Sequence, residues 1–271
     1  MHRITFIGGG NMARSLVGGL ISKGTEASAI AIAEPRPEAR QALEHDFGVT
    51  TFAEGMKAVD GAEIVVLAVK PQVLPGVCGD LAEIIARDKP LVVSIAAGIR
   101  TDQLERWLGD TPAIVRCMPN TPSLIGAGAT GLFANAQVSD KQKQQAEDLL
   151  ETAGLTAWIE DESQIDTVTG ISGSAPAYYF LMVEALEDAA VARGLPRETA
   201  RKLAAQTCMG AGRMMVEGNE SPDALRKRVT SPNGTTQAAL ESFAADGLRQ
   251  IVARAVDACA TRGAELASDN D

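Results

Sequence analysis

The feature of this sequence that most constrains its fold is a change of rhythm near residue 160. Before that point, short apolar runs bounded by Gly, Pro or Asp alternate with stretches of helical periodicity. The runs span residues 4–7, 29–33, 64–68, 91–95 and 113–117, and the first helical patterns span residues 12–22 and 37–46. Strands that are apolar on both faces and separated by helices are typical of a parallel sheet covered by helices. Residues 1–160 are therefore predicted to form a Rossmann-type, doubly wound α/β domain.

The second part of the chain, residues 161–271, is predicted to be all helical. Helical patterns span residues 175–193, 197–217, 235–245 and 248–267, separated by breaks rich in Gly, Pro and Asn. These helices are rich in Ala and apolar on more than one side, so we expect a homo-oligomer, with packing inside one chain as the alternative. Residues 268–271 are expected to be disordered.

Composition excludes several classes of function. The net charge of -10 disfavours nonspecific binding to nucleic acid. No run of roughly 18 apolar residues occurs, so no membrane span is expected. The opening residues are too few for the apolar region of a signal peptide, which predicts a cytoplasmic protein. The two histidines lie far from any cysteine and from each other, so we expect no zinc or other metal site. The cysteines are interpreted as small buried apolar residues in a reducing compartment: Cys78, Cys117, Cys208 and Cys259.

A glycine turn follows the first predicted strand and precedes an apolar helix. Gly8, Gly10 and Ala13 match the G-x-G-x-x-A pattern of dinucleotide-binding turns, with Asn11 and Met12 between them. The first glycine of the pattern makes the tight turn, the second lets a pyrophosphate approach the backbone, and the helix N-terminus faces the anion. A dinucleotide site is expected here. A glycine-rich turn without a ligand is the alternative.

The residues after the second predicted strand bear on which dinucleotide binds. Glu34 stands where an acid would bond the ribose hydroxyl groups and favour NADH. Arg36 and Arg40 follow at once and can instead hold the 2′-phosphate of NADPH. Glu34 can also simply favour the positive end of the helix that follows Pro35. These three readings stay open.

Three further strand ends are expected to face the cofactor, because the carboxyl ends of parallel strands line the ligand crevice. Small residues and a proline-fixed turn suit a flat ligand, and Asn120 can bond an amide. The candidate residues are Ala68, Val69, Lys70, Pro71, Ala97, Gly98 and Asn120. For Lys70 a solvated surface lysine is the alternative, and for Asn120 a plain loop.

Two loops stand out in the helical half. Residues 170–178 begin a long helix, where Ser174 is a good N-cap and Pro176 suits the first turn. Residues 229–236 place several backbone amides and hydroxyl groups at a helix N-terminus, which is a ready site for a carboxylate. Capping by Thr235 or Thr236 is the alternative for the second loop.

Taken together, these segments resemble the pyrroline-5-carboxylate reductase family over essentially the whole chain. The matching motifs are GGGNMA, LAVKP, SIAAG, MPNTP, TGISGSAPAY and VTSPNGTT. The resemblance implies a helical dimerisation domain interwoven with that of a second subunit, and an active site near the dimer interface. It also implies hydride transfer from NADPH, or from NADH, to the C=N carbon of 1-pyrroline-5-carboxylate, which gives L-proline as the last step of proline biosynthesis.

The resemblance also assigns roles to single residues. Thr236 would hydrogen-bond the imine nitrogen, and the backbone amides of Gly234, Thr235 and Thr236 would hold the substrate carboxylate. Ser174 and Glu162 are expected near the substrate. A protonated imine is already electrophilic, so orientation against the nicotinamide can supply much of the acceleration, without a metal or a covalent nucleophile.

This sequence departs from the family pattern at three positions. Asn233 stands where glycine is usual, and asparagine is the best substitute for glycine at positive φ, so we expect the loop to persist. Ala175 also replaces a usual glycine, which can alter the start of that helix. Glu34 replaces the usual Asn or Ser, so the preference between NADPH and NADH stays open.

Other functions are compatible with parts of this pattern. A β-hydroxyacid dehydrogenase shares the plan of a Rossmann domain followed by helices, but it needs a lysine in the helix after Gly173, and residues 175–193 contain none. An imine reductase acting on another ring size and a nicotinamide-sensing binding protein without turnover are further alternatives. The sequence leaves open whether the oligomer is a dimer or a decamer.

Overall fold

The computed structural model describes residues 3–109 and 111–269. The chain falls into two compact units. One is formed by the residues up to Ser174 together with those from Ala258 onward, and the other is formed by Ala175–Asp257. The polypeptide therefore passes between the units twice, and each unit is described below by itself.

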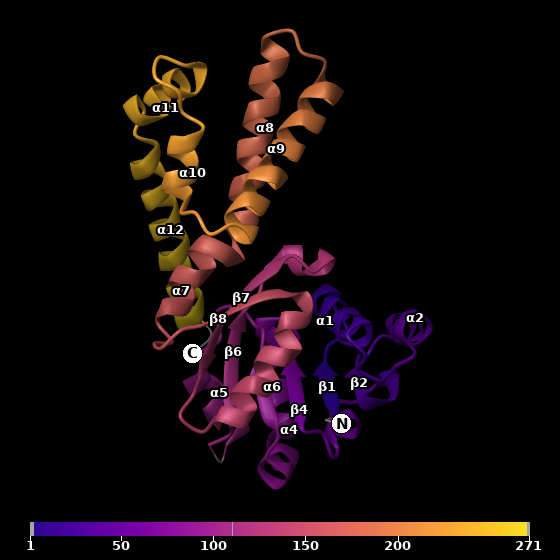
Figure 1. Cartoon of the computed structure of the whole chain (residues 1–271). Helices are drawn as coiled ribbons and strands as arrows, with labels where there is room; N and C mark the ends of the chain where they lie inside the picture. The colour runs from indigo at the N-terminus through magenta and orange to yellow at the C-terminus, as the bar shows by residue number, and fades with distance from the viewer. Residues whose placement is uncertain (1–2, 110, 270–271) are drawn as a thin grey trace. The chain divides into compact units, whose positions relative to one another are not determined.

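The first unit contains an eight-stranded sheet in the order β3-β2-β1-β4-β5-β6-β7-β8. Figure 1 labels β1, β2, β4, β6, β7 and β8 of this sheet. The strands are β1 (Ile4–Ile7), β2 (Ile30–Ala33), β3 (Thr50–Phe52), β4 (Ile64–Leu67), β5 (Leu91–Ser94), β6 (Ile114–Met118), β7 (Gly128–Ala134) and β8 (Gly154–Trp158). The predicted strands are confirmed as β1, β2, β4, β5 and β6, each within one residue of the expected ends.

The predicted parallel sheet is confirmed for β1 to β6, and two further strands extend it at one side. Strand β7 runs antiparallel to β6, and β8 then pairs parallel to β7. These two strands escaped prediction because neither is a continuous apolar run: β7 reads GATGLFA with two glycines, and β8 alternates between half-buried and exposed residues. Strand β3 was also missed, since it has only three residues.

Helices cover both faces of this sheet and give it two hydrophobic cores. On one face lie α1 (Asn11–Ser22), α2 (Pro37–Phe47) and α6 (Asp140–Leu150); on the other lie α3 (Gly55–Val59), α4 (Leu74–Asp88) and α5 (Thr101–Leu108). Phe6 and Leu16 are fully buried in the first core, and Leu67 and Leu74 in the second. The doubly wound α/β architecture is therefore confirmed.

The register of the sheet brings three strand ends together. Ile7 is the partner of Ala33 on one side and of Leu67 on the other. The Gly8 amide continues this pairing by donating to the Ala33 carbonyl (2.8 Å), and the Ala68 amide donates to the Ile7 carbonyl (2.8 Å). The glycine turn, the residues after β2 and the residues after β4 therefore meet at one edge.

The segment before the long helix α8 (Ala175–Ala192) is itself helical. Helix α7 (Gln164–Val168) continues through a single π-helical turn at Thr169–Gly173 directly into α8. The Ser174 amide donates to the Thr169 carbonyl (2.8 Å), and Ser174 has helical φ and ψ. The prediction that Ser174 is an N-cap was wrong, because an N-cap needs an extended backbone at the start of a helix.

The second unit is helical, as predicted. Helices α8 and α9 (Arg197–Glu217) lie side by side, and α11 (Thr235–Ala245) and α12 (Leu248–Asp269) were also expected; α10 (Pro222–Arg228) was not. The expected disorder was wrong at residues 268–269, because α12 continues through them. Gln103 Nε2 donates to the carbonyl of the buried Ala267 (3.1 Å), which anchors this end of α12 in the first unit. Residues 270–271 lie outside the described residues.

Among the described residues, none of the helices combines the length and apolarity that crossing a membrane requires. Over the same part of the chain, no cluster of three His, Cys, Asp or Glu side chains is placed to hold a metal ion, and His2 lies outside that part. All four cysteines are free, with Cys78 and Cys117 buried and Cys208 and Cys259 half-buried. Burial raises the pKa of the Cys78 thiol to about 12, which makes it unreactive.

Candidate active site

Two glycines of the turn after β1 are required for different reasons. Gly8 has φ +104°, and a Cβ there would lie 2.6 Å from the Ala68 carbonyl oxygen, so the fold itself needs glycine. Gly10 is exposed, and a Cβ there would meet no atom within 4 Å. The protein's own packing therefore does not require glycine at residue 10, and the space beside it is available to a ligand.

The N-terminus of α1 has the properties of an anion site. Gly10 is its N-cap, no side chain caps it, and the first turn carries no acidic residue. The helical ladder begins with the bond from the Arg14 amide to the Gly10 carbonyl (2.9 Å), so the amides of Asn11, Met12 and Ala13 precede it. Such an end fits the pyrophosphate of a dinucleotide.

A cavity of about 870 Å³ extends from this turn along the carboxyl ends of β1, β2, β3 and β4. Seven predicted cofactor residues line it: Gly8, Gly10, Glu34, Arg36, Ala68, Val69 and Lys70. Other predicted residues are not among its lining: Asn11, Met12, Pro71, Ala97, Gly98 and Asn120. Residues that were not expected also line it, among them Ala53, Glu54, Gly55, Met56, Val73, Val77, Asp80 and Leu81. The first four of these follow β3, so recognising the short run Thr50–Phe52 as a strand would have indicated them.

Glu34 lies at the end of β2 with its carboxylate turned into the protein. Its Oε2 accepts a hydrogen bond from the Gly9 amide (3.2 Å), and its Oε1 accepts bonds from the Arg36 amide (3.2 Å) and from Arg36 Nε (2.8 Å). Burial opposes ionisation of this carboxyl group, but the hydrogen bonds from Arg36 and Gly9 outweigh it and lower the pKa. Arg40 donates to the carbonyls of Glu34 and Pro35 (2.9 Å each) and does not line the cavity.

Two predicted nicotinamide-side residues make internal contacts. Asn120 Nδ2 donates to the Ser172 carbonyl (3.2 Å), and its Oδ1 accepts from the Ala129 amide (3.0 Å), so this side chain joins the loop after β6 to β7 and to the π turn. Gly98 has φ +69°, and a Cβ there would lie 3.3 Å from Leu266 Cβ in α12. The lack of a side chain at Gly98 thus allows α12 to pack closely.

Glu162 takes part in a largely buried ion pair. Its Oε1 accepts hydrogen bonds from the Thr101 amide (2.8 Å) and from Arg116 Nη1 (2.8 Å), and its Oε2 accepts from the Thr101 hydroxyl (2.6 Å). The Arg116 side chain is only 5% exposed. These bonds join the segment before α7 to α5 and to β6. Ser174, at the end of the π turn, accepts a hydrogen bond from the Cys259 thiol (3.4 Å).

The loop before α11 keeps the shape expected of it. Asn233 has φ +57°, which confirms that asparagine takes the positive-φ position usually filled by glycine. Gly234 is the N-cap of α11, and no side chain caps that helix, so the alternative of a threonine cap was wrong. The Gly234 amide donates to the Ser231 carbonyl (3.0 Å). The expected carboxylate clamp therefore loses one of its three amides, because this one closes the turn.

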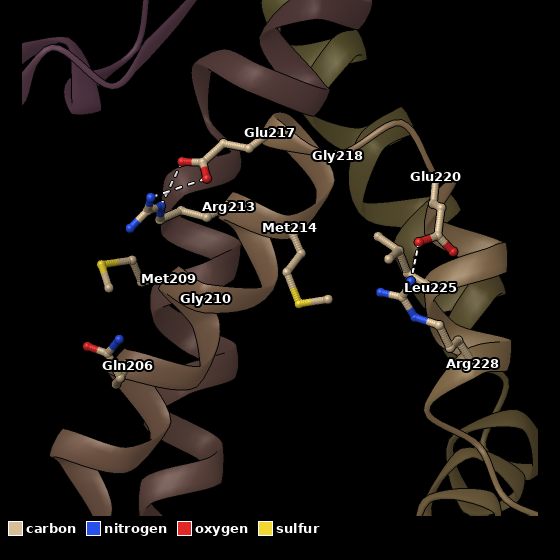
Figure 2. A pocket seen from close by; sticks show the side chains of 10 residues that line it. All are labelled: Gln206, Met209, Gly210, Arg213, Met214, Glu217, Gly218, Glu220, Leu225 and Arg228. Atoms are coloured by element: carbon tan, nitrogen blue, oxygen red, sulfur yellow. Dashed lines mark hydrogen bonds and ion pairs between the residues drawn. The ribbon is translucent and has the colours of Figure 1, made fainter.

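A second cavity, of about 480 Å³, lies in the helical unit between α9 and α10 (Figure 2). Met209, Met214 and Leu225 give it an apolar lining. Two ion pairs flank it, Arg213 with Glu217 (2.7 Å) and Arg228 with Glu220. None of the predicted site residues lines this cavity.

The first unit has the fold and the crevice of a nicotinamide-dinucleotide oxidoreductase. The helical region of the chain matches a different family model. Residues 3–98 match the family model described as NADP oxidoreductase, coenzyme F420-dependent. Residues 162–266 match the model described as pyrroline-5-carboxylate reductase dimerisation.

Comparisons over the full length identify the family. A pyrroline-5-carboxylate reductase of Pseudomonas aeruginosa is 49% identical over 265 residues, which cover 98% of this chain and 97% of the relative. The structure of a pyrroline-5-carboxylate reductase from Coxiella burnetii is 44% identical, with a TM-score of 0.95 and 98% of both chains covered. The Plasmodium falciparum pyrroline carboxylate reductase, solved with NADP bound, is 27% identical with a TM-score of 0.84, again over 98% of both chains. The chain belongs to the pyrroline-5-carboxylate reductase family.

Proposed function

We propose that this protein reduces the C=N bond of 1-pyrroline-5-carboxylate to give L-proline, the last step of proline biosynthesis, with NADPH as the reductant and NADH as a possible substitute. The observation that carries the proposal is the N-terminus of α11. Thr235 and Thr236 are the first two residues of this helix, and each offers a backbone amide and a hydroxyl group there. Within the described residues, no side chain caps this end of the helix. Such a helix end suits a substrate that carries both a carboxylate and a polar nitrogen.

The cofactor part of the proposal is supported by the crevice of the first unit. The open space at Gly10, the uncapped N-terminus of α1 and the cavity of about 870 Å³ fit a dinucleotide. When bound, the nicotinamide supplies the hydride. Gly8 and Gly10 would hold the pyrophosphate side, Arg36 would meet the adenosine ribose, and Glu34 would hold Arg36. The other proposed cofactor residues are Asn11, Met12, Ala68, Val69, Lys70, Pro71, Ala97, Gly98 and Asn120.

The chain's own residues then have to orient the imine. We assign to Thr236 a hydrogen bond with the imine nitrogen, and to the amides of Thr235 and Thr236 the substrate carboxylate. A protonated imine already accepts a hydride, so orientation is the main requirement. Ser174 and Glu162 stay candidates for the substrate side. Because the Glu162 oxygens are held by Thr101 and Arg116, its proposed part is to position that region.

The helical region is the proposed dimerisation region, with the boundary of the cofactor domain near residue 160. Large apolar side chains of α8 are exposed in the single chain, among them Tyr179 (59%), Phe180 (67%) and Leu181 (65%). A homodimer would cover such side chains. Light scattering measures the mass in solution, where two copies indicate the dimer, ten copies a decamer, and one copy contradicts the oligomer.

The test of the function is the loss of reduced-nicotinamide absorbance with pyrroline-5-carboxylate, run with NADPH and with NADH. We expect turnover, and we expect Thr236→Ala to lower kcat/KM by about 100-fold because it removes a hydrogen bond at the reacting nitrogen. Thr236→Ser keeps the hydroxyl group and should retain most of the activity. Thr167→Ala, an exposed change in α7, is the matched control. Cofactor binding without turnover with either reductant would refute the proposal.

A further inference from the structure

The acid at the end of β2 does not have the geometry of a ribose-binding acid. The Glu34 residue is only 5% exposed, and both of its carboxylate oxygens accept hydrogen bonds from within the protein. Arg36, in contrast, is an exposed residue that lines the cavity, with a side chain 69% exposed. The group that this end of the crevice offers to a cofactor is therefore the guanidinium of Arg36.

The charged side chains that line the cavity carry a slight excess of negative charge. Glu54 and Asp80 line it together with Glu34, whereas its positive side chains are Arg36 and Lys70. Glu54 is already paired with Lys57 (2.9 Å), which lies outside the lining. Lys70 follows β4, which β1 separates from β2. A 2′-phosphate at the end of β2 would thus depend on Arg36, and that arginine is already partly neutralised by Glu34.

We propose that Glu34 sets the cofactor preference through Arg36: turned away from the ribose and bonded to Gly9 and Arg36, it limits the attraction of Arg36 for a 2′-phosphate, so that the protein prefers NADPH to NADH only modestly. This inference rests on the proposed function, because it concerns the cofactor of the same reaction. It differs from the usual reading of an acid at this position, in which the carboxylate bonds the ribose hydroxyl groups and selects NADH.

The two readings predict different responses of a ligand without a 2′-phosphate to the loss of the Glu34 charge. If the carboxylate held the ribose, Glu34→Gln would weaken the binding of 5′-AMP, since a charge-assisted hydrogen bond would be lost. If Glu34 acts only on Arg36, the same change leaves 5′-AMP binding within twofold. It then strengthens the binding of 2′,5′-ADP by about fivefold, the equivalent of roughly 1 kcal/mol.

The experiment is isothermal titration calorimetry of the full chain with 5′-AMP and with 2′,5′-ADP, neither of which can transfer a hydride. Arg36→Ala should weaken 2′,5′-ADP by about tenfold and leave 5′-AMP within twofold. Glu83→Gln removes an equal charge from an exposed position of α4 that neither lines the cavity nor acts on Arg36, and should change neither affinity by more than twofold. Because Arg36 is exposed, its variant remains informative even where Glu34→Gln impairs folding.

Each outcome decides the question. A tenfold weaker affinity for 5′-AMP in Glu34→Gln, or an unchanged affinity for 2′,5′-ADP in Arg36→Ala, overturns the inference. The expected pattern supports it, and the ratio of kcat/KM for NADPH to that for NADH should then rise in Glu34→Gln. The nucleotide titrations need no imine, so a protein that passes them without reducing pyrroline-5-carboxylate refutes only the proposed function. A protein that reduces the imine but fails the titrations refutes only the inference.

Discussion

Gly8 and Gly10 provide a test of which glycine serves the fold and which serves the cofactor. Gly10 has φ −72° and ψ −176°, which any residue can adopt, and a Cβ there meets no atom within 4 Å. The change Gly10→Ala should therefore leave the protein folded. Its methyl group would instead occupy the space through which a pyrophosphate approaches the amides of α1.

The magnitudes follow from these surroundings. Alanine is a poorer N-cap than glycine by about 0.5 kcal/mol, and it gains about 0.4–1 kcal/mol by restricting the unfolded chain, so the free energy of unfolding of Gly10→Ala should change by less than about 1 kcal/mol. Loss of one hydrogen bond to a charged phosphate costs about 2 kcal/mol, or roughly 30-fold in the Kd of NADPH. Gly8→Ala should destabilise the fold by about 3 kcal/mol, because it combines a strained positive φ with a clash against the Ala68 carbonyl.

Two measurements separate the glycines. Urea unfolding gives the change in stability, and the fluorescence of bound NADPH gives its Kd, both for the same preparations. We expect Gly10→Ala to lose affinity at nearly constant stability, and Gly8→Ala to lose stability. Unchanged NADPH affinity in a folded Gly10→Ala protein would show that the pyrophosphate does not approach residue 10, and the proposed placement of the cofactor would then be wrong.

Three further predictions concern the rest of the chain. Asn233→Ala should lower the free energy of unfolding by about 1 kcal/mol, whereas Asn233→Gly should change it by less than about 0.5 kcal/mol, because asparagine and glycine both adopt φ +57° at little cost and alanine does not. Equal effects of the two changes in urea unfolding would contradict this. Glu162→Ala should cost about 3 kcal/mol of unfolding free energy by leaving Arg116 buried without its partner, and a loss below about 1 kcal/mol would show that the pair contributes little. Burial raises the pKa of Asp166, and the nearby Glu162 carboxylate raises it further against the opposing effect of Arg116. Above that raised pKa, the ionised form of Asp166 therefore destabilises the fold. Asp166→Asn should increase the free energy of unfolding at about pH 7, and this increase should vanish as the pH falls towards about 3.

Sequence periodicity predicted the strands that are apolar on both faces, since their burial requires no knowledge of neighbours. The glycine turn could be placed for the same reason: a strand, a tight turn and an apolar helix are local features. Strands β7 and β8 could not be predicted in this way. Their residues become strand through pairing at one side of the sheet, where one face stays partly exposed and the apolar pattern is weak.

The candidate site shows where local reasoning stops. The role of Glu34 depends on the Gly9 amide, which reaches it only because β1 and β2 pair in one particular register. The bonds of Glu162 depend on Thr101, 61 residues away in the sequence. Ser174 was expected to cap a helix, but the π turn before it supplies a hydrogen bond that no residue pattern in the sequence indicated. Asn233 was predictable, because its conformation is a property of the residue itself.

The end of α12 has a consequence for how this protein is made. Gly98 and Gln103 belong to the part of the first unit that the ribosome releases early, yet their contacts come from Leu266 and Ala267, the second of which lies 164 residues after Gln103. During synthesis Gly98 and Gln103 therefore lack these contacts until nearly all the described chain has been translated. The first unit therefore cannot be completed one segment at a time as it is synthesised, because the docking of α12 is its last step.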